Sequence, residues 1–113
     1  MRSLHRKPKH PERGIQKAII KMLQIRGWYV RVTHGSIYQS GLPDLFATHA
    51  EHGPRWIEVK LPRMIGSHFT SAQRDVFPKL TKNGSGVWIL TAATVAEYEK
   101  LFRPCNWWVY LVR

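Results

Sequence analysis

The 113-residue chain has little cysteine, few acidic residues and no long apolar run, and each shortage excludes a class of protein. Cys105 is the single cysteine, so no internal disulfide can form, which suits a reducing compartment such as the cytoplasm. Apolar runs such as residues 107–112 are far too short to cross a bilayer. The basic N-terminus is not followed by the apolar core of a secretory signal. We therefore expect a cytoplasmic protein with no membrane association.

Acidic residues are scarce relative to basic ones. Seven Asp and Glu stand against 18 Lys and Arg, which gives a formal net charge of +11. Such a balance favours a polyanionic partner, because each neutralised phosphate releases condensed counterions. A solvated basic surface without a specific partner is the plain alternative. An anionic membrane is a third, although no basic amphipathic helix with a clean polar face is present. The charge therefore favours a nucleic acid as the partner.

The chain divides into an arm and one domain. Residues 1–10 are rich in Lys and Arg and poor in apolar residues, which predicts a flexible basic arm. The arm would either tether the protein to DNA or only keep this end in solution. Residues 11–113 are enough for a single domain, since one domain typically has about 100–150 residues.

A first helix is predicted where apolar side chains recur at helical spacing from Ile15 to Leu23. Pro11 and Glu12 suit its first turn, and Gly27 suits its end.

A second helix is predicted from Thr70, whose hydroxyl and the side chain of Gln73 form a capping-box pattern. Pro78 lies inside this helix and predicts a kink or an early end, because proline lacks the amide hydrogen. A second capping-box pattern opens a third helix over residues 94–102.

Strand composition recurs in several segments between and after these helices. They are residues 28–32, 44–48, 55–60, 87–90 and 106–112. Turn residues at 50–54 predict an antiparallel hairpin between the second and third strands. The order α-β-β-β-α-β-α-β indicates an α/β fold in which helices flank a mixed β-sheet.

The strongest chemical signal is Gly41-Leu42-Pro43-Asp44 followed by Glu58-Val59-Lys60. Side chains alternate along a strand, so Glu58 and Lys60 share a face, and Asp44 begins the partner strand. Two carboxylates and the backbone carbonyl of Val59 would then be within reach of one divalent cation such as Mg²⁺. A metal-bound water can attack phosphorus, and Lys60 can stabilise the charge that develops.

Structural explanations exist for each part of this motif. Pro43 and Asp44 suit a turn that enters a strand, and Glu58 with Lys60 suits an ion pair on a solvated face. Two of only seven acidic residues nevertheless fall in this arrangement, on strands predicted to be adjacent. The spacing therefore favours a metal-dependent nuclease.

Four segments resemble, in order and spacing, the motifs of the virus-type replication-repair nuclease (VRR-NUC) family, which belongs to the PD-(D/E)xK, or restriction-endonuclease-like, superfamily. They are Glu12-x-x-Ile15-Gln16, Gly41-x-Pro43-Asp44, Glu58-Val59-Lys60 and Thr70-x-x-Gln73. The resemblance runs from about Glu12 to Leu90 and covers most of the chain. Pro78 and the Trp-rich final segment depart from the usual family pattern.

The resemblance implies a restriction-endonuclease-like core and Mg²⁺- or Mn²⁺-dependent hydrolysis of DNA. It implies that Asp44 and Glu58 are metal ligands, that Lys60 is the catalytic lysine, and that Glu12 and Gln73 are further catalytic residues. Without the resemblance, Glu12 is explained as a favourable charge at a helix start and Gln73 by its capping box.

Small members without added domains resemble the phage-borne branch of the family. This implies a homodimer that cuts branched DNA such as four-way (Holliday) junctions, in the host cell cytoplasm if the gene is carried by a phage. A nuclease that prefers flaps or single strands is an alternative. A non-catalytic basic module that binds nucleic acid is the alternative from another class.

Polar and basic residues on both sides of the motif are candidates for DNA contacts. They are Ser36, Gln39 and Ser40 before it, and Arg63, His68 and Arg74 after it. An ordinary surface loop and a solvated basic rim explain them as well. The six His residues are scattered, and none pairs with Cys105 at the spacing of a zinc site.

The aromatic C-terminal segment has two interpretations. Trp107, Trp108 and Tyr110 could stack on unpaired bases. We favour a place in the core or in a dimer interface, because large aromatic residues dominate both.

Overall fold

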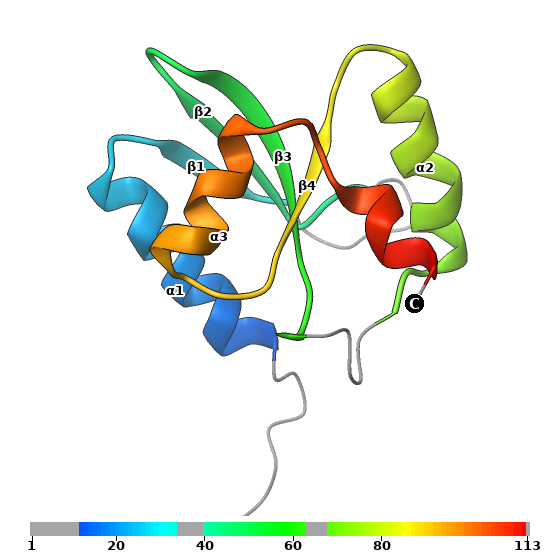
Figure 1. Cartoon of the computed structure of the whole chain (residues 1–113), viewed down its shortest axis with the longest axis horizontal. Helices are drawn as coiled ribbons and strands as arrows, with labels where there is room; N and C mark the ends of the chain where they lie inside the picture. Colours follow the sequence, from blue (N-terminus) through cyan, green and yellow to red (C-terminus); the bar gives the residue numbers. More distant parts are fainter. Residues whose placement is uncertain (1–11, 34–39, 63–67, 113) are drawn as a thin grey trace, which may run out of the picture.

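Four strands and three α-helices make up most of the part that a computed structural model describes, residues 12–33, 40–62 and 68–112 (Figure 1). In chain order the elements are α1 (Glu12–Ile25), β1 (Tyr29–Val32), β2 (Leu45–His49), β3 (Gly53–Val59), α2 (Ser71–Lys82), β4 (Val87–Leu90) and α3 (Val95–Glu99). Two 3-10 helices follow, η2 (Lys100–Phe102) and η3 (Trp107–Val112).

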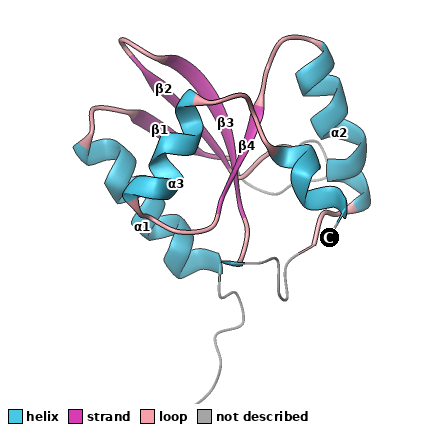
Figure 2. Ribbon diagram, viewed as in Figure 1, coloured by secondary structure: helices cyan, strands magenta, loops and turns pink. Residues whose placement is uncertain are grey.

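The strands form one mixed sheet in the order β1-β2-β3-β4 (Figure 2). β1 pairs with β2 and β2 with β3 in antiparallel fashion, whereas β3 and β4 are parallel. The predicted hairpin between the second and third strands is therefore confirmed. β3 and β4 can be parallel because α2 connects them and returns the chain to the end of the sheet at which β3 began.

Two clusters of buried apolar side chains lie on opposite faces of the sheet. One joins α1 and η2 to the sheet and contains Ile19, Leu23, Trp28, Leu45, Ala47, Ile57, Val59, Leu90 and Leu101. The other joins α2 and η3 to β4 and contains Phe69, Phe77, Val87, Ile89 and Trp107. Figure 1 shows α1 and α3 on one side of β4 and α2 with η3 on the other. Because Ile57 and Val59 face the first cluster, Glu58 between them faces α2.

Most predicted elements are confirmed to within two residues. α1 ends before Gly27, which has the positive φ (+90°) expected of a helix-ending glycine. The fourth strand is found as predicted. The third helix is split into α3 and η2, and its capping box is half formed. Thr94 accepts from the Glu97 amide, but the Glu97 carboxylate accepts from Thr91. Pro11 and the basic arm lie outside the described residues.

The predicted final strand over residues 106–112 is wrong, because this segment forms η3. A short apolar run cannot distinguish a strand from a buried helical turn. Tertiary packing favours the helical turn, because Trp107 is buried against Phe77 and its indole N–H donates to the Thr81 hydroxyl at 2.8 Å. Trp107 is thus a core residue, as favoured, whereas Trp108 remains 46% exposed.

An early end of the second helix at Pro78 is also wrong, because α2 continues to Lys82. Phe77, fully buried beside the proline, anchors this part of the helix. At the end of α2 the backbone N–H of Asn83 donates to Lys79 and Leu80, and its side chain donates to Lys79. These contacts hold the turns after the proline.

Within the described part of the chain, no helix has the length and apolar character needed to cross a membrane.

Candidate active site

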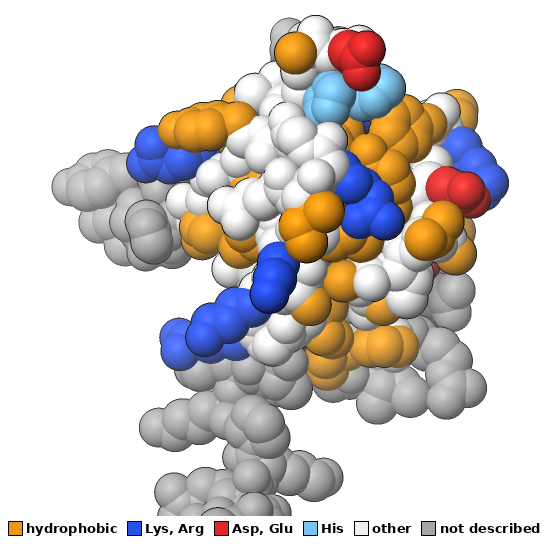
Figure 3. All heavy atoms as spheres, turned by 90° about the vertical axis from the view of Figure 1, so that its left-hand side faces the viewer, with side chains coloured by type: hydrophobic (Ala, Val, Ile, Leu, Met, Phe, Trp, Pro, Cys, Tyr) orange, Lys and Arg blue, Asp and Glu red, His pale blue; other side chains and the backbone are white. Residues whose placement is uncertain are grey.

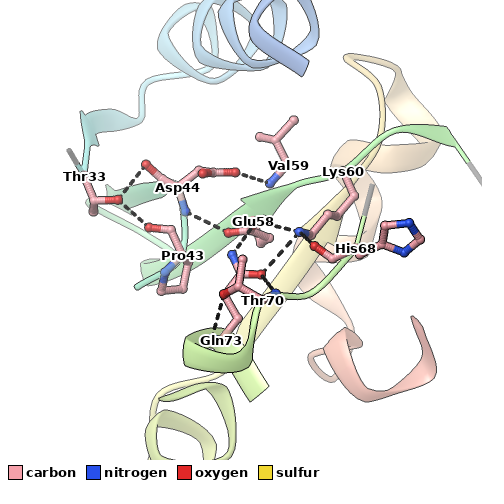
Figure 4. Close-up of polar contacts among 9 residues, drawn as sticks. All are labelled: Thr33, Pro43, Asp44, Glu58, Val59, Lys60, His68, Thr70 and Gln73. Carbon is pink, nitrogen blue, oxygen red and sulfur yellow. Dashed lines mark hydrogen bonds and ion pairs between the residues drawn. The ribbon is translucent and has the colours of Figure 1, made fainter. Parts of the chain in front are cut away.

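The Gly-x-Pro-Asp and Glu-x-Lys segments meet where β2 begins and β3 ends (Figure 4). The Asp44 amide donates to Glu58 Oε1 at 3.1 Å, and the Val59 amide donates to Asp44 Oδ2 at 2.9 Å. Pro43, the residue across from Val59, has no N–H, and its carbonyl accepts from Thr33 Oγ1 at 2.6 Å. The strand ladder therefore ends here, and each carboxylate binds a backbone amide of the other strand.

Glu58 is 3% exposed and has a partner at both carboxylate oxygens. While Oε1 accepts from Asp44, Oε2 accepts from Gln73 Nε2 at 2.8 Å and lies 3.2 Å from Lys60 Nζ. The carboxylate is thus fixed by the hairpin, by α2 and by the residue that follows β3.

Lys60 is 4% exposed, and its ammonium nitrogen has three acceptors. They are the His68 carbonyl at 2.6 Å, Glu58 Oε2 at 3.2 Å and Gln73 Oε1 at 3.3 Å. An ammonium carries three hydrogens, so these acceptors can use all of its donors. The charge is held in one position, 5.0 Å from the centre of the Phe69 ring.

Gln73 links the start of α2 to the carboxylate and the lysine. The predicted capping box is confirmed: Thr70 Oγ1 accepts from the Gln73 amide, and Gln73 Oε1 accepts from the Thr70 amide. Its Nε2 remains available for Glu58. The structural and the functional explanations of Gln73 are therefore compatible, since one side chain makes both sets of contacts.

Gly41 sets the distance between the motif loop and α2. Its φ is +88°, and a Cβ added there would lie 2.5 Å from the Ala72 carbonyl oxygen and 2.7 Å from the Val76 side chain. A side chain at this position would strain the backbone and push the loop away from the helix. The glycine lets Asp44 and Gln73 approach the same carboxylate.

Burial makes the two carboxylates hard to ionise together. The pKa of Glu58 is raised from 4.5 to about 8, chiefly by burial and then by the charge of Asp44. The pKa of Asp44 is also raised, first by burial, against the opposing hydrogen bond from Val59. The charge of Glu12 raises it further and that of Lys60 lowers it. A divalent cation bound between the two carboxylates would offset the repulsion between their negative charges.

The structure brings together five of the predicted site residues, Asp44, Glu58, Val59, Lys60 and Gln73. The N–H and C=O of one strand residue point to the same side, so the Val59 carbonyl faces the β2 side, as does the amide that binds Asp44. Glu12 is close enough for its charge to act on Asp44. We call Asp44, Glu58, Lys60 and Gln73 the strand-end site.

The predicted DNA contacts are less well supported. His68 contributes its backbone carbonyl to Lys60, while its side chain is exposed. Arg74 is exposed on α2 directly after Gln73, and Ser40 precedes Gly41. Ser36, Gln39 and Arg63 lie outside the described residues.

Thr33 is a site residue that sequence reasoning missed. Its hydroxyl donates to Pro43 and lies 3.1 Å from the Asp44 carbonyl, which also accepts the Thr33 amide at 2.9 Å. It thereby holds the backbone that carries Asp44. Thr33 lies across from Asp44 when the β1–β2 register is continued by one residue. The sequence alone does not give this register, so it could not identify Thr33.

A second group of possible ligands occupies the turn at the other end of the hairpin. His49, Glu51 and His52, the hairpin cluster, have ligand atoms that all lie within 4.8 Å of one another. Sequence reasoning found no metal-like spacing among the histidines and missed it. Figure 3 shows histidine side chains in pale blue beside an acidic one in red on the surface.

Local contacts already account for the hairpin cluster. His49 Nδ1 accepts from the Glu51 amide at 3.0 Å, and its Nε2 lies 3.1 Å from the Arg26 carbonyl oxygen. Both imidazoles pack on the Trp28 ring, at 5.1 and 5.9 Å between centroids. A metal would therefore have to displace an existing contact of His49.

Comparisons with protein-family models, with curated proteins and with solved structures found no match.

Proposed function

We propose that this chain is a metal-dependent, structure-selective DNA endonuclease with a restriction-endonuclease-like core of the VRR-NUC type. The observation that carries the proposal is the strand-end site itself. The half-buried Asp44 carboxylate and the buried Glu58 carboxylate each accept a backbone amide of the other strand, and the buried Lys60 ammonium pairs with Glu58. Its setting in a chain of net charge +11 supports a polyanionic substrate.

The topology around the site supports this kind of core. α1 precedes an antiparallel β1-β2-β3 unit, and α2 then leads to a parallel β4. The acidic residues lie in the hairpin of that unit, and the glutamine lies on the helix that follows it. This is the arrangement that the motif resemblance implies.

The donor set suits Mg²⁺ or Mn²⁺, which prefer oxygen ligands. Asp44, Glu58 and the Val59 carbonyl would hold the ion, and its charge would offset the cost of ionising both carboxylates. When bound, such an ion activates water and withdraws charge from a phosphate.

The chain's own groups would act on the phosphodiester through position and charge. Lys60 would stabilise the negative charge that develops on the phosphate, after exchanging one of its three contacts. The contact to Gln73 is the longest, at 3.3 Å. Gln73 would orient both Glu58 and Lys60, and Glu12 would contribute charge near Asp44.

The substrate proposed is branched DNA such as a four-way junction, cut by a homodimer. Two sites related by two-fold symmetry would cut paired strands at a branch point. The exposed Trp108 and Val109 on η3 offer apolar area for such a contact.

The decisive experiment compares wild type with Asp44→Asn on four-way, flapped, linear and single-stranded DNA in Mg²⁺ and in Mn²⁺. Wild type should cleave at least one of them. Asp44→Asn should bind DNA as well as wild type and lose cleavage by more than the ~10²–10³-fold seen when one transition-state donor is removed.

Asp75→Asn is the matched control, because Asp75 is an exposed carboxylate on α2 paired with Lys79. It should cleave like wild type. Wild type that leaves every DNA intact while binding it would refute the nuclease and support a non-catalytic binding module.

A further inference from the structure

The sheet face that carries the carboxylates continues into a pair of aromatic residues. Phe46 lies across from Trp56 in the β2–β3 register, two residues along each strand from Asp44 and Glu58. Residues two apart share a face and lie about 6.6 Å apart along the strand. That distance is comparable to the spacing of successive nucleotides in an extended strand. The carboxylates and the aromatic pair therefore form neighbouring rows on one surface.

A cation and a third aromatic residue extend this surface onto β1. Arg31 lies across from Phe46, and Tyr29 lies across from Thr48 in the next row. Arg31 is exposed and donates to the Tyr29 hydroxyl at 3.1 Å, while Tyr29 is 59% exposed. We call Tyr29, Arg31, Phe46 and Trp56 the aromatic face. Of the described helices, α2 covers β4 rather than this part of the sheet.

The aromatic pair borders a hollow of about 430 Å³. Phe46 and Trp56 stand at 5.1 Å between ring centroids with planes 63° apart, and both are only half-buried. The turn from Gly84 to Gly86 lines the hollow as well, and a Cβ added at Gly84 would have no neighbour within 4 Å. Its size falls within the range of about 300–1,000 Å³ typical of ligand pockets.

Packing alone explains only part of this arrangement. Trp56 contacts the second hydrophobic cluster, but Phe46 belongs to neither cluster. A second copy of the chain is the other candidate occupant. Association through this face would bring two exposed Arg31 side chains against each other. A polyanion with flat apolar rings, such as single-stranded DNA, matches both the positive charge of Arg31 and the aromatic rings of this face.

We propose that Phe46 and Trp56 stack with an unpaired base of the DNA strand whose backbone passes the strand-end site, with Arg31 contacting the same backbone. The cleaved strand is then unpaired beside the scissile phosphate, as in a flap or an opened branch point. Aromatic side chains beside cations are the usual means of holding single strands. The inference rests on the proposed function for its ligand, but its test measures binding and not cleavage.

The test uses full-length Asp44→Asn protein, which prevents cutting, and a single-stranded oligonucleotide with 2-aminopurine scanned through its positions. Stacking should quench the fluorescence at one or two positions. Phe46→Leu keeps an apolar side chain but removes the ring, and should abolish this quenching. It should also weaken single-strand binding about tenfold, with little change for blunt duplex. Phe102→Leu is the control, because Phe102 is 44% exposed and packs with Trp28 on the opposite face.

Two outcomes would overturn the inference. One is equal single-strand affinity and equal quenching in Phe46→Leu and Phe102→Leu. The other is a dimer that dissociates in Phe46→Leu while DNA affinity is unchanged, which would make the face a protein interface. Arg31→Ala is the second variant, for use if Phe46→Leu does not fold, because Arg31 is exposed and its loss should not disturb folding. This substitution should lower single-strand affinity more than duplex affinity. Quenching without any cleavage by wild type would refute the nuclease and leave the stacking site standing.

Discussion

The β2–β3 hairpin has a cluster of ionisable side chains at each end, and the two differ in how they are built. The strand-end site draws on both strands of the hairpin and on α2, and its Glu58 and Lys60 are almost fully buried. The hairpin cluster lies within one turn, and two of its three residues are exposed. Both offer ligands for a cation, but of the two only the strand-end site has ionisable side chains that are almost fully buried.

Burial perturbs the ionisation of the strand-end site, and the exposed hairpin cluster lacks such burial. In the strand-end site the pKa of Glu58 is raised to about 8, so the folded protein holds a group that would ionise readily in water. Strong perturbation of this kind by burial and a neighbouring charge is typical of functional sites. In the hairpin cluster, imidazoles that pack on Trp28 stabilise a turn. The predictions below test this contrast.

After the loss expected of Asp44→Asn, the largest expected effect comes from Lys60→Ala. Removing the buried ammonium should lower the rate of DNA cleavage about 10²-fold, because no other described cation lies against Glu58. Single-turnover cleavage in Mn²⁺ measures it. An unchanged rate would assign the stabilising role to another group.

Gln73→Ala separates positioning from charge in the same assay. This substitution leaves Lys60 in place but removes the contacts that orient Lys60 and Glu58. The cleavage rate should fall about tenfold, as it typically does when an orienting partner is lost. Gln73→Glu should not restore the rate, because a carboxylate cannot donate to Glu58.

A smaller effect is expected in the pH dependence of stability without metal. The pKa of Glu58 is higher in the folded protein than its ordinary value of 4.5. Between about pH 4.5 and about pH 8 the unfolded chain therefore binds fewer protons at this group, and stability falls as the pH rises. Glu58→Gln removes this dependence. Its melting temperature relative to wild type should thus be higher at pH 8 than at pH 5 when both are measured with a chelator.

Glu51→Gln is the control for this measurement, because it also removes one acidic group but from the exposed hairpin cluster. Parallel curves for wild type and Glu58→Gln across this pH range would contradict the raised pKa.

The smallest effect is expected from the hairpin cluster. His49→Ala and His52→Ala should leave Mn²⁺-dependent cleavage unchanged, because the cluster lies at the opposite end of the hairpin from Asp44. The rise in melting temperature on adding Mn²⁺ should persist in both variants and disappear in Asp44→Asn. Loss of cleavage in either histidine variant would transfer the cation to the hairpin cluster.

Local signals were sufficient for much of the fold. The capping box at Thr70 and the turn before Gly53 predicted their elements because the interactions span only a few residues. The final segment failed because a run of large apolar side chains suits a strand and a buried helical turn equally well. The early end predicted at Pro78 was wrong because the helix is held by the buried Phe77 beside the proline and by capping contacts at Asn83.

The sequence by itself determined which side chains share one end of the hairpin, since the placing of Asp44, Glu58 and Lys60 follows from strand alternation and one hairpin. Only the tertiary structure decided their environment. It buried Glu58 and Lys60 beside Gln73 of α2, directed all three Lys60 contacts to protein acceptors, and extended their face into Phe46 and Trp56. The physical reason is that burial, and the pKa changes it causes, depend on what packs across the sheet, and that information is spread over residues far apart in the chain.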